Sequence, residues 1–180
     1  MLLHTCCAPC ALPIIEYLIK NKKADNLSLF FSNSNIYPKK EYEKRLEEVR
    51  KIARIYNLKF SIDPIKEQEW IKYLKKNLSL PLEEYKENGE RCKFCFSFRL
   101  KQSFIFAKKQ GFKNLGTTLS INCWKDTSFI NSLGKELENE YRINYHIFPL
   151  NMSSAHKKEI ELSKKYRIYR QKYCGCKFSL

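Results

Sequence analysis

The N-terminal stretch MLLHTCCAPC, residues 1–10, decides the fold because it joins a short apolar run to the start of a helix. Residues 2–5 have the composition of a buried strand, and Pro9 suits the first turn of a helix, where its missing N–H is not needed. The apolar residues that follow recur at helical spacing: Leu12, Ile15, Leu18 and Ile19. A strand that leads directly into a helix is typical of a parallel α/β sheet.

The rest of the chain repeats this alternation. Short apolar runs predict further strands at residues 26–31, 60–62, 113–118 and 144–148. Apolar residues at helical spacing predict helices at residues 39–56, 67–76, 92–109, 126–141 (with Asp126 as N-cap) and 156–166. The sequence therefore predicts one domain over residues 1–180, with a Rossmann-like (HUP-like) parallel sheet, flanking helices, a cysteine-bearing helical insertion and a cysteine-bearing C-terminal tail. Ligands of such sheets bind beyond the carboxyl ends of the strands, which is where the first cysteines follow.

The chain is strongly basic, with 34 Lys and Arg against 19 Asp and Glu and a formal net charge of +15. A charge of this size predicts a polyanionic partner such as RNA, although a lysine-rich, AT-biased genome would produce the same surface. Tyrosines are interleaved with basic residues in the segment 151–180, which favours contact with phosphates and splayed bases. The candidate RNA contacts, each with a solvated surface charge as its alternative, are Arg91, Arg99, Arg167, Arg170 and Lys172.

The sequence shows no sign of export. Its N-terminus has no basic segment followed by an apolar one of signal-peptide length, and no apolar run is long enough to span a membrane. We therefore expect a cytoplasmic protein with no membrane partner, in which disulfides are a poor explanation for the eight cysteines. No glycine-rich phosphate loop is present, so the sequence does not support a nucleotide cofactor.

Seven of the cysteines fall in three clusters: Cys6, Cys7 and Cys10; Cys92 and Cys95; and Cys174 and Cys176. The first two clusters lie at predicted helix starts, where free N–H groups and the helix dipole favour thiolates. Gly175 gives the backbone the freedom to turn both sulfur atoms of the last pair toward one centre. A zinc ion and a 4Fe–4S cluster each take at most four cysteines, so seven exceed either requirement. The count predicts an iron–sulfur site with thiols left over for a further metal or a redox pair, and isolated Cys123 is expected to be dispensable.

Five segments carry a resemblance to a known family. HTCCAPC (4–10), GERCKFCFSFRL (89–100) and YRQKYCGCKFSL (169–180) hold the cysteines, and FFSNSNIYP (30–38) and NLGTTLSINCWKD (114–126) lie between them. Together they resemble the cobalamin-independent epoxyqueuosine reductases of the QueH type over nearly the whole chain. The chain differs from the family pattern at Ser32 and Ser34, where members often carry Tyr and Pro, and around Cys123 and Trp124.

The resemblance implies an oxidoreductase of tRNA modification that catalyses the last step of queuosine biosynthesis. Its substrate would be tRNA carrying epoxyqueuosine at the wobble position, and its reaction the deoxygenation of that epoxide to queuosine. The implied cofactors are a 4Fe–4S cluster and an adjacent mononuclear iron, with all seven clustered cysteines as the pool of metal ligands. The cluster ligands are drawn from Cys7, Cys10, Cys92, Cys95, Cys174 and Cys176. An external donor of the ferredoxin or flavodoxin kind would supply electrons.

Alternative interpretations remain open at this point. A zinc-stabilised RNA-binding protein without redox activity would share the cysteines and the charge, and a thioredoxin-like dithiol would leave two clusters unexplained. A sulfur-inserting tRNA thiolase would need the nucleotide-binding loop that the chain lacks.

The candidate proton donors each have a structural alternative. His4 adjoins the first cluster but is also placed to be a buried supporting histidine. Tyr173 adjoins the last cluster but could simply pack, and Asp126 could cap its helix. Asn33 and Asn35 follow the second predicted strand and are candidates for hydrogen bonds to the base.

Overall fold

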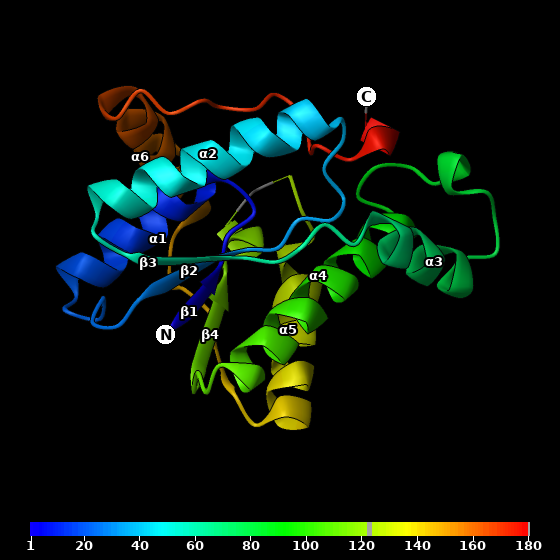
Figure 1. Ribbon diagram of the computed structural model, residues 1–180, viewed down its shortest axis with the longest axis horizontal. Coiled ribbons are helices and arrows are strands. Elements are labelled where there is room, and N and C mark those ends of the chain that lie inside the picture. Colours follow the sequence, from blue (N-terminus) through cyan, green and yellow to red (C-terminus); the bar gives the residue numbers. More distant parts are fainter. Residues whose placement is uncertain (122–123, 180) are drawn as a thin grey trace.

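The computed structural model describes residues 1–121 and 124–179. Its elements follow one another in a regular alternation of strand and helix (Figure 1): β1 (Leu2–His4), α1 (Ala8–Lys20), β2 (Ser28–Phe31), α2 (Lys39–Ile55), β3 (Lys59–Ile62), α3 (Glu67–Asn77), η1 (Leu82–Glu84), α4 (Glu90–Lys109), β4 (Asn114–Thr117), η2 (Thr118–Ile121), α5 (Thr127–Tyr141), β5 (Asn144–His146), α6 (Met152–Lys165) and η3 (Lys177–Ser179).

The strands form one sheet in the order β3-β2-β1-β4-β5, and every pairing is parallel. β1 is central, with Leu3 opposite Leu29 of β2 on one side and Gly116 of β4 on the other. From β1 the chain adds β2 and β3 on one side, and after α4 it adds β4 and β5 on the other. A topological switch point therefore lies between β1 and β4. A crevice at the carboxyl ends of these strands is where such sheets bind ligands. The predicted Rossmann-like α/β fold is confirmed.

Helices cover both faces of the sheet. Successive residues of β1 point to opposite faces, so Leu3 packs into a core with α1, α2 and α6, whereas Leu2 packs into a core with α4 and α5. Figure 1 shows α1, α2 and α6 on one side of the sheet and α4 and α5 on the other. The three inner strands, β1, β2 and β4, are therefore buried on both faces, as parallel strands usually are, whereas the edge strands β3 and β5 are partly exposed.

The predicted insertion and C-terminal tail meet in a smaller core of their own. Trp70 and Leu74 of α3 pack with Phe98 of α4, and the tail adds Phe178, whose ring centroid lies 6.1 Å from that of Trp70. This core also contains Cys95 and Cys176. The packing of the insertion thus brings the second and third cysteine clusters together.

Most predicted boundaries differ from the structure by one or two residues, and the start of the last helix differs by four. The last helix begins at Met152 rather than at residue 156, because the Asn151 side chain caps it by accepting a hydrogen bond from the Ser154 N–H at 3.1 Å. The fifth strand ends at His146 rather than at residue 148. Within the described residues, no helix has the length and apolar character needed to cross a membrane.

Candidate metal centre

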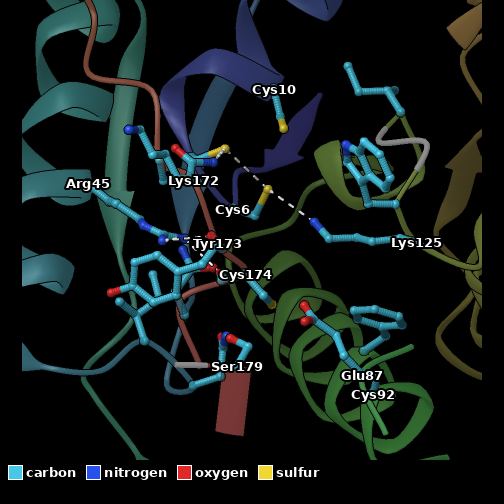
Figure 2. Close-up of a pocket in the computed structure, with 18 of the residues that line it drawn as sticks. Cys6, Cys10, Arg45, Glu87, Cys92, Lys125, Lys172, Tyr173, Cys174 and Ser179 are labelled. Carbon is cyan, nitrogen blue, oxygen red and sulfur yellow. Dashed lines mark hydrogen bonds between the residues drawn. The ribbon is translucent and has the colours of Figure 1, made fainter. Parts of the chain in front are cut away.

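A cavity of about 510 Å³ opens at the carboxyl end of β1, and cysteines from all three clusters line it. They are Cys6, Cys7 and Cys10 after β1, Cys92 from α4 and Cys174 from the tail. Figure 2 shows Cys6 and Cys10 on one side of this space and Cys92 and Cys174 on the other. The structure therefore brings together three segments that are far apart in the sequence, as predicted.

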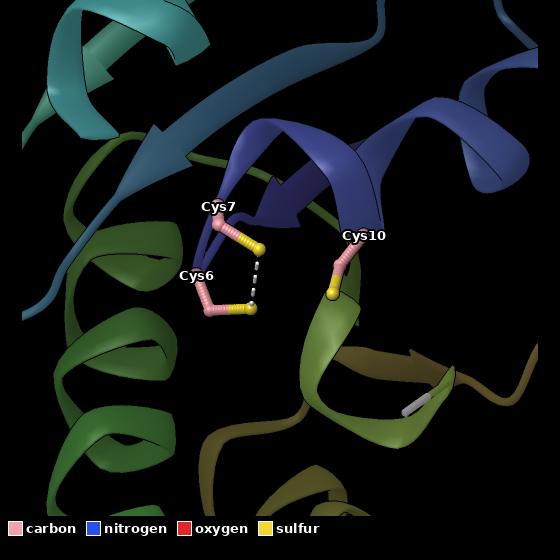
Figure 3. A group of neighbouring side chains, drawn as sticks. All are labelled: Cys6, Cys7 and Cys10. Carbon is pink, nitrogen blue, oxygen red and sulfur yellow. Dashed lines mark hydrogen bonds between the residues drawn. The ribbon is translucent and has the colours of Figure 1, made fainter. Parts of the chain in front are cut away.

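The first cysteine set, Cys6, Cys7 and Cys10, is compact and buried. Its three sulfur atoms all lie within 4.8 Å of one another, and those of Cys6 and Cys7 are 3.7 Å apart (Figure 3). Cys7 is the N-cap of α1 and has an extended backbone, and no side chain caps the helix. The free N–H groups and positive end of the helix dipole therefore favour negative charge at these thiols.

Hydrogen bonds and a nearby cation favour a thiolate at Cys6. Hydrogen bonds from Cys10 and Cys7 hold the pKa of Cys6 well below its usual range, and Lys125 adds to this effect. The Thr118 hydroxyl also donates to the Cys6 sulfur at 3.2 Å. The Nζ of Lys125 lies 4.0 Å from the Cys6 sulfur (Figure 2). Burial acts to lower the pKa of Lys125, but the negative charges of Cys6 and Cys10 outweigh this effect and raise that pKa.

The second cysteine set consists of Cys92, Cys95, Cys174 and Cys176, which line one small enclosed pocket beneath Trp70. Cys92 and Cys95 lie in the first turns of α4, and Cys174 and Cys176 flank Gly175 in the tail. Burial raises the pKa of Cys95 to about 12 and that of Cys176 to about 11. Cys92 and Cys174 line both the pocket and the main cavity, so the two sets are adjacent.

His4 lies under the first cysteine set and not on the cavity wall. It is completely buried, its Nε2 lies 3.1 Å from the Ser32 carbonyl oxygen, and its Nδ1 lies 2.7 Å from the Thr117 hydroxyl. A carbonyl oxygen only accepts, so Nε2 carries the proton and Nδ1 accepts from Thr117. Burial lowers the pKa of His4 to about 3, so the ring is neutral and joins β1 to β2 and β4. Of the two roles that the sequence allowed, proton donor and buried supporting histidine, the position of His4 fits the second.

Tyr173 and Asp126 take different positions. Tyr173 lines the cavity, and its hydroxyl donates to the Tyr37 carbonyl oxygen at 3.1 Å. Asp126 caps α5 by accepting a hydrogen bond from the Phe129 N–H at 2.9 Å, as its predicted capping role requires. Of the three candidate proton donors, Tyr173 is the one that lines the cavity.

The five candidate RNA contacts divide by burial. Arg170 and Lys172 are exposed at the rim of the cavity, and Arg170 pairs with Glu159 at 3.1 Å. Arg167 is exposed after α6 but does not line the cavity. Arg91 and Arg99, in contrast, are buried.

The two buried arginines make hydrogen bonds within the protein. Arg91 donates to the carbonyl oxygens of Leu82 at 2.6 Å and Tyr85 at 2.7 Å, so it holds the loop before α4 and offers no surface charge. Arg99 lines the cavity and donates from Nη2 to Asn33 Oδ1. Asn33 in turn donates to the Thr5 carbonyl oxygen, which leaves Asn35 as the freer of the two candidate asparagines.

Three residues of the site carried no prediction. Lys125 approaches Cys6 because η2 follows β4 directly, and Gln171 donates to the Cys7 sulfur at 2.9 Å. Arg45 reaches the cavity from α2. One signal was available for Arg45, because it falls on the same helical face as buried Tyr42 and Val49. Cys123, predicted to be dispensable, lies outside the described residues.

Comparison with known proteins gives a consistent result. A family model described as "Epoxyqueuosine reductase QueH" matches residues 1–180. Curated proteins with that name include one from Acinetobacter baylyi, 34% identical over 100% of this chain and 80% of the relative, and one from Thermotoga maritima, 34% identical over 100% and 90%. One from Staphylococcus aureus is 32% identical over 99% and 75%.

Among solved structures, the NH3-dependent NAD synthetase from Campylobacter jejuni matches with a TM-score of 0.45. It is 15% identical, and the match covers 91% of this chain and 75% of that one.

Proposed function

The chain belongs to the epoxyqueuosine reductase QueH family, and from this premise we propose that it deoxygenates epoxyqueuosine at the wobble position of tRNA in an iron-dependent reaction. The reduction would be the last step of queuosine biosynthesis and would take place in the cytoplasm. The observation that carries the proposal is the convergence of seven cysteines, in two adjacent sets, at the carboxyl end of β1: five line the cavity, and Cys95 and Cys176 line the small pocket beside it.

The donor chemistry of each set fits one metal centre. Metal–sulfur bonds of about 2.3 Å in a tetrahedral site separate the sulfur atoms by roughly 3.8 Å. The Cys6 and Cys7 sulfur atoms are 3.7 Å apart, and all three of the first set lie within 4.8 Å of one another. Among the described residues, no other group of three or more such ligand atoms is packed within 4.8 Å, so the second set is more open. Four cysteines with wider spacing are the ligands of a 4Fe–4S cluster. We therefore assign the cluster to Cys92, Cys95, Cys174 and Cys176 and the single iron to Cys6, Cys7 and Cys10.

The reaction needs two electrons and two protons, and it converts the epoxide to an alkene and water. Bound at these two sets, the metals would supply electrons and a Lewis acid for the epoxide oxygen. An external ferredoxin- or flavodoxin-like donor would restore the electrons. Lys125, beside Cys6, is placed to stabilise negative charge that develops on the oxygen. Tyr173 lines the cavity, but its hydroxyl donates to the Tyr37 carbonyl oxygen, so it would have to leave that partner to give the substrate a proton.

Two cavity-lining residues carry a buried polar atom that would be available to the substrate base once the side chain turns toward the cavity. Asn35 Oδ1 and Arg99 Nε have no hydrogen-bond partner among the described residues, although both side chains are at least nine-tenths buried. The Watson–Crick edge of a 7-deazaguanine carries an N–H and an amino group that donate and a carbonyl oxygen that accepts. One acceptor and one donor on the wall complement that edge, and Arg170 and Lys172 at the rim would contact phosphates.

Complementation of a strain that lacks this protein tests the proposal. Its tRNA should accumulate epoxyqueuosine, and the wild-type gene should restore queuosine, as measured by mass spectrometry of nucleosides. Cys95→Ala should fail to restore queuosine. Ser97→Ala, which removes a hydroxyl that donates to the Lys93 carbonyl oxygen of the same helix, should succeed. Normal queuosine in the deleted strain, with no second reductase encoded, would rule out the assignment.

A further inference from the structure

Arg45 is a buried arginine whose guanidinium group donates hydrogen bonds to the backbone of the C-terminal tail. It is 3% exposed, and its Nη1 donates to the Cys174 carbonyl oxygen at 2.8 Å while Nη2 donates to that of Tyr173 at 3.1 Å. Its Nε is fixed from the other side by Glu41 at 2.7 Å, one helical turn earlier in α2. Figure 2 shows the arginine extended from its helix toward Tyr173 and Cys174.

The same part of α2 also binds the tail residue Tyr169, which precedes the cysteines. The Tyr169 hydroxyl donates to Glu41 at 3.2 Å, and Lys44 Nζ lies 3.4 Å from the centre of the Tyr169 ring. One residue beyond the carbonyl groups that Arg45 binds, the Gly175 carbonyl oxygen accepts a hydrogen bond from the Tyr37 N–H at 2.7 Å. The segment from Tyr169 to Gly175 is therefore attached to one end of α2 and the loop before it.

Gly175 completes the contact because no other residue fits there. Its φ is +105°, a conformation that side chains rarely adopt, and a Cβ at this position would lie 2.7–2.9 Å from the guanidinium atoms of Arg45. The glycine between the two last cysteines thus lets the arginine approach the backbone directly. The absence of a side chain at Gly175 therefore leaves the space that the Arg45 guanidinium occupies.

We propose that Arg45 is a positioning residue that fixes Cys174 and Cys176 against Cys92 and Cys95, and so preassembles the second cysteine set from a tail that has no helix or strand of its own at these cysteines. The identity of the metal rests on the proposed function, but the positioning of the thiols does not. Two charge-assisted hydrogen bonds to consecutive carbonyl groups provide the restraint, because the charged donor makes each bond stronger than a neutral one.

Position-resolved alkylation tests this role on the anaerobically purified full chain. The variants are Arg45→Met, Arg45→Lys and Gly175→Ala, with Arg54→Met as the control, since Arg54 is an exposed arginine on the same helix. A brief pulse of N-ethylmaleimide followed by peptide mass spectrometry reports the labelling of each cysteine, and iron is counted on the same samples. Labelling reports local opening of the tail, so it does not depend on turnover.

Arg45→Met should raise labelling of Cys174 and Cys176 by at least about tenfold, because it removes both charge-assisted hydrogen bonds and the loss of one alone corresponds to about that factor, while Cys10 stays unchanged. Gly175→Ala should have the same effect, the Arg45→Met/Gly175→Ala double variant should add little, and Arg45→Lys should fall between Arg45→Met and wild type. Unchanged labelling in Arg45→Met would overturn the proposal, and so would equal exposure of all cysteines, which indicates general unfolding. Wild-type protein without iron would refute the proposed function, yet the labelling comparison would still decide the role of Arg45.

Discussion

Replacing His4 with Phe is expected to destabilise the protein through the hydrogen bonds that the imidazole makes in the centre of the sheet. Phe has a larger ring than His, so no cavity is created, and any overpacking adds to the loss. It leaves the Ser32 carbonyl oxygen and the Thr117 hydroxyl without their partner, and each unsatisfied buried group costs about 1–3 kcal/mol. The Thr117 oxygen still accepts from the Leu119 N–H at 3.2 Å, which moderates the loss. We therefore expect the free energy of unfolding to fall by about 2–4 kcal/mol.

Urea unfolding followed by circular dichroism measures this change. With a slope of about 2 kcal/mol per molar urea, the midpoint should fall by roughly 1–2 M. Thr117→Val removes one of the two partners, so the His4→Phe/Thr117→Val double variant should lose less than the sum of the single variants. An unchanged midpoint in His4→Phe, together with full iron content and lost turnover, would refute this reasoning and make His4 a group that acts on the substrate.

Three further predictions concern packing, charge and the cysteine outside the described residues. Gly134→Ala should destabilise the fold by about 1–3 kcal/mol in the same urea assay, because its Cβ would lie 2.2–2.5 Å from atoms of the Tyr145 ring; an unchanged midpoint would show that the ring moves freely. Lys125→Met should reduce kcat by about tenfold or more at unchanged iron content, because the cation beside Cys6 is lost; unaltered kcat would remove Lys125 from the reaction. Cys123→Ala should keep both iron and turnover, and loss of iron in that variant would place this thiol at the site.

Much of the fold could be predicted from the sequence because the apolar pattern is local. The helical spacing after Pro9 and the short apolar runs depend on neighbouring residues, and each predicted strand lies in the parallel sheet. The convergence of the cysteines was also accessible. Cys6 follows the central strand, and Cys92 and Cys95 lie at the start of a helix that packs on the same sheet.

The division of the cysteines into two sets could not be predicted, because it depends on contacts between distant segments. Arg45 and Phe178 are among the contacts that hold the tail beside Cys92 and Cys95, and neither contact has a local signal in the tail sequence. The place of Arg91 beside the central cysteine pair favours the interior, but its partners there, the carbonyl oxygens of Leu82 and Tyr85, could not be predicted from the sequence.

A metal and sulfide count on protein purified without oxygen, carried out for wild type, Cys10→Ala and Cys95→Ala, tests the two-centre assignment most directly. Wild type should carry about five irons and four sulfides per chain, the sum of one 4Fe–4S cluster and one single iron. Cys10→Ala should lose about one iron and keep its sulfide, whereas Cys95→Ala should lose the sulfide. A colourless wild-type protein that holds one zinc ion and no sulfide would contradict the account.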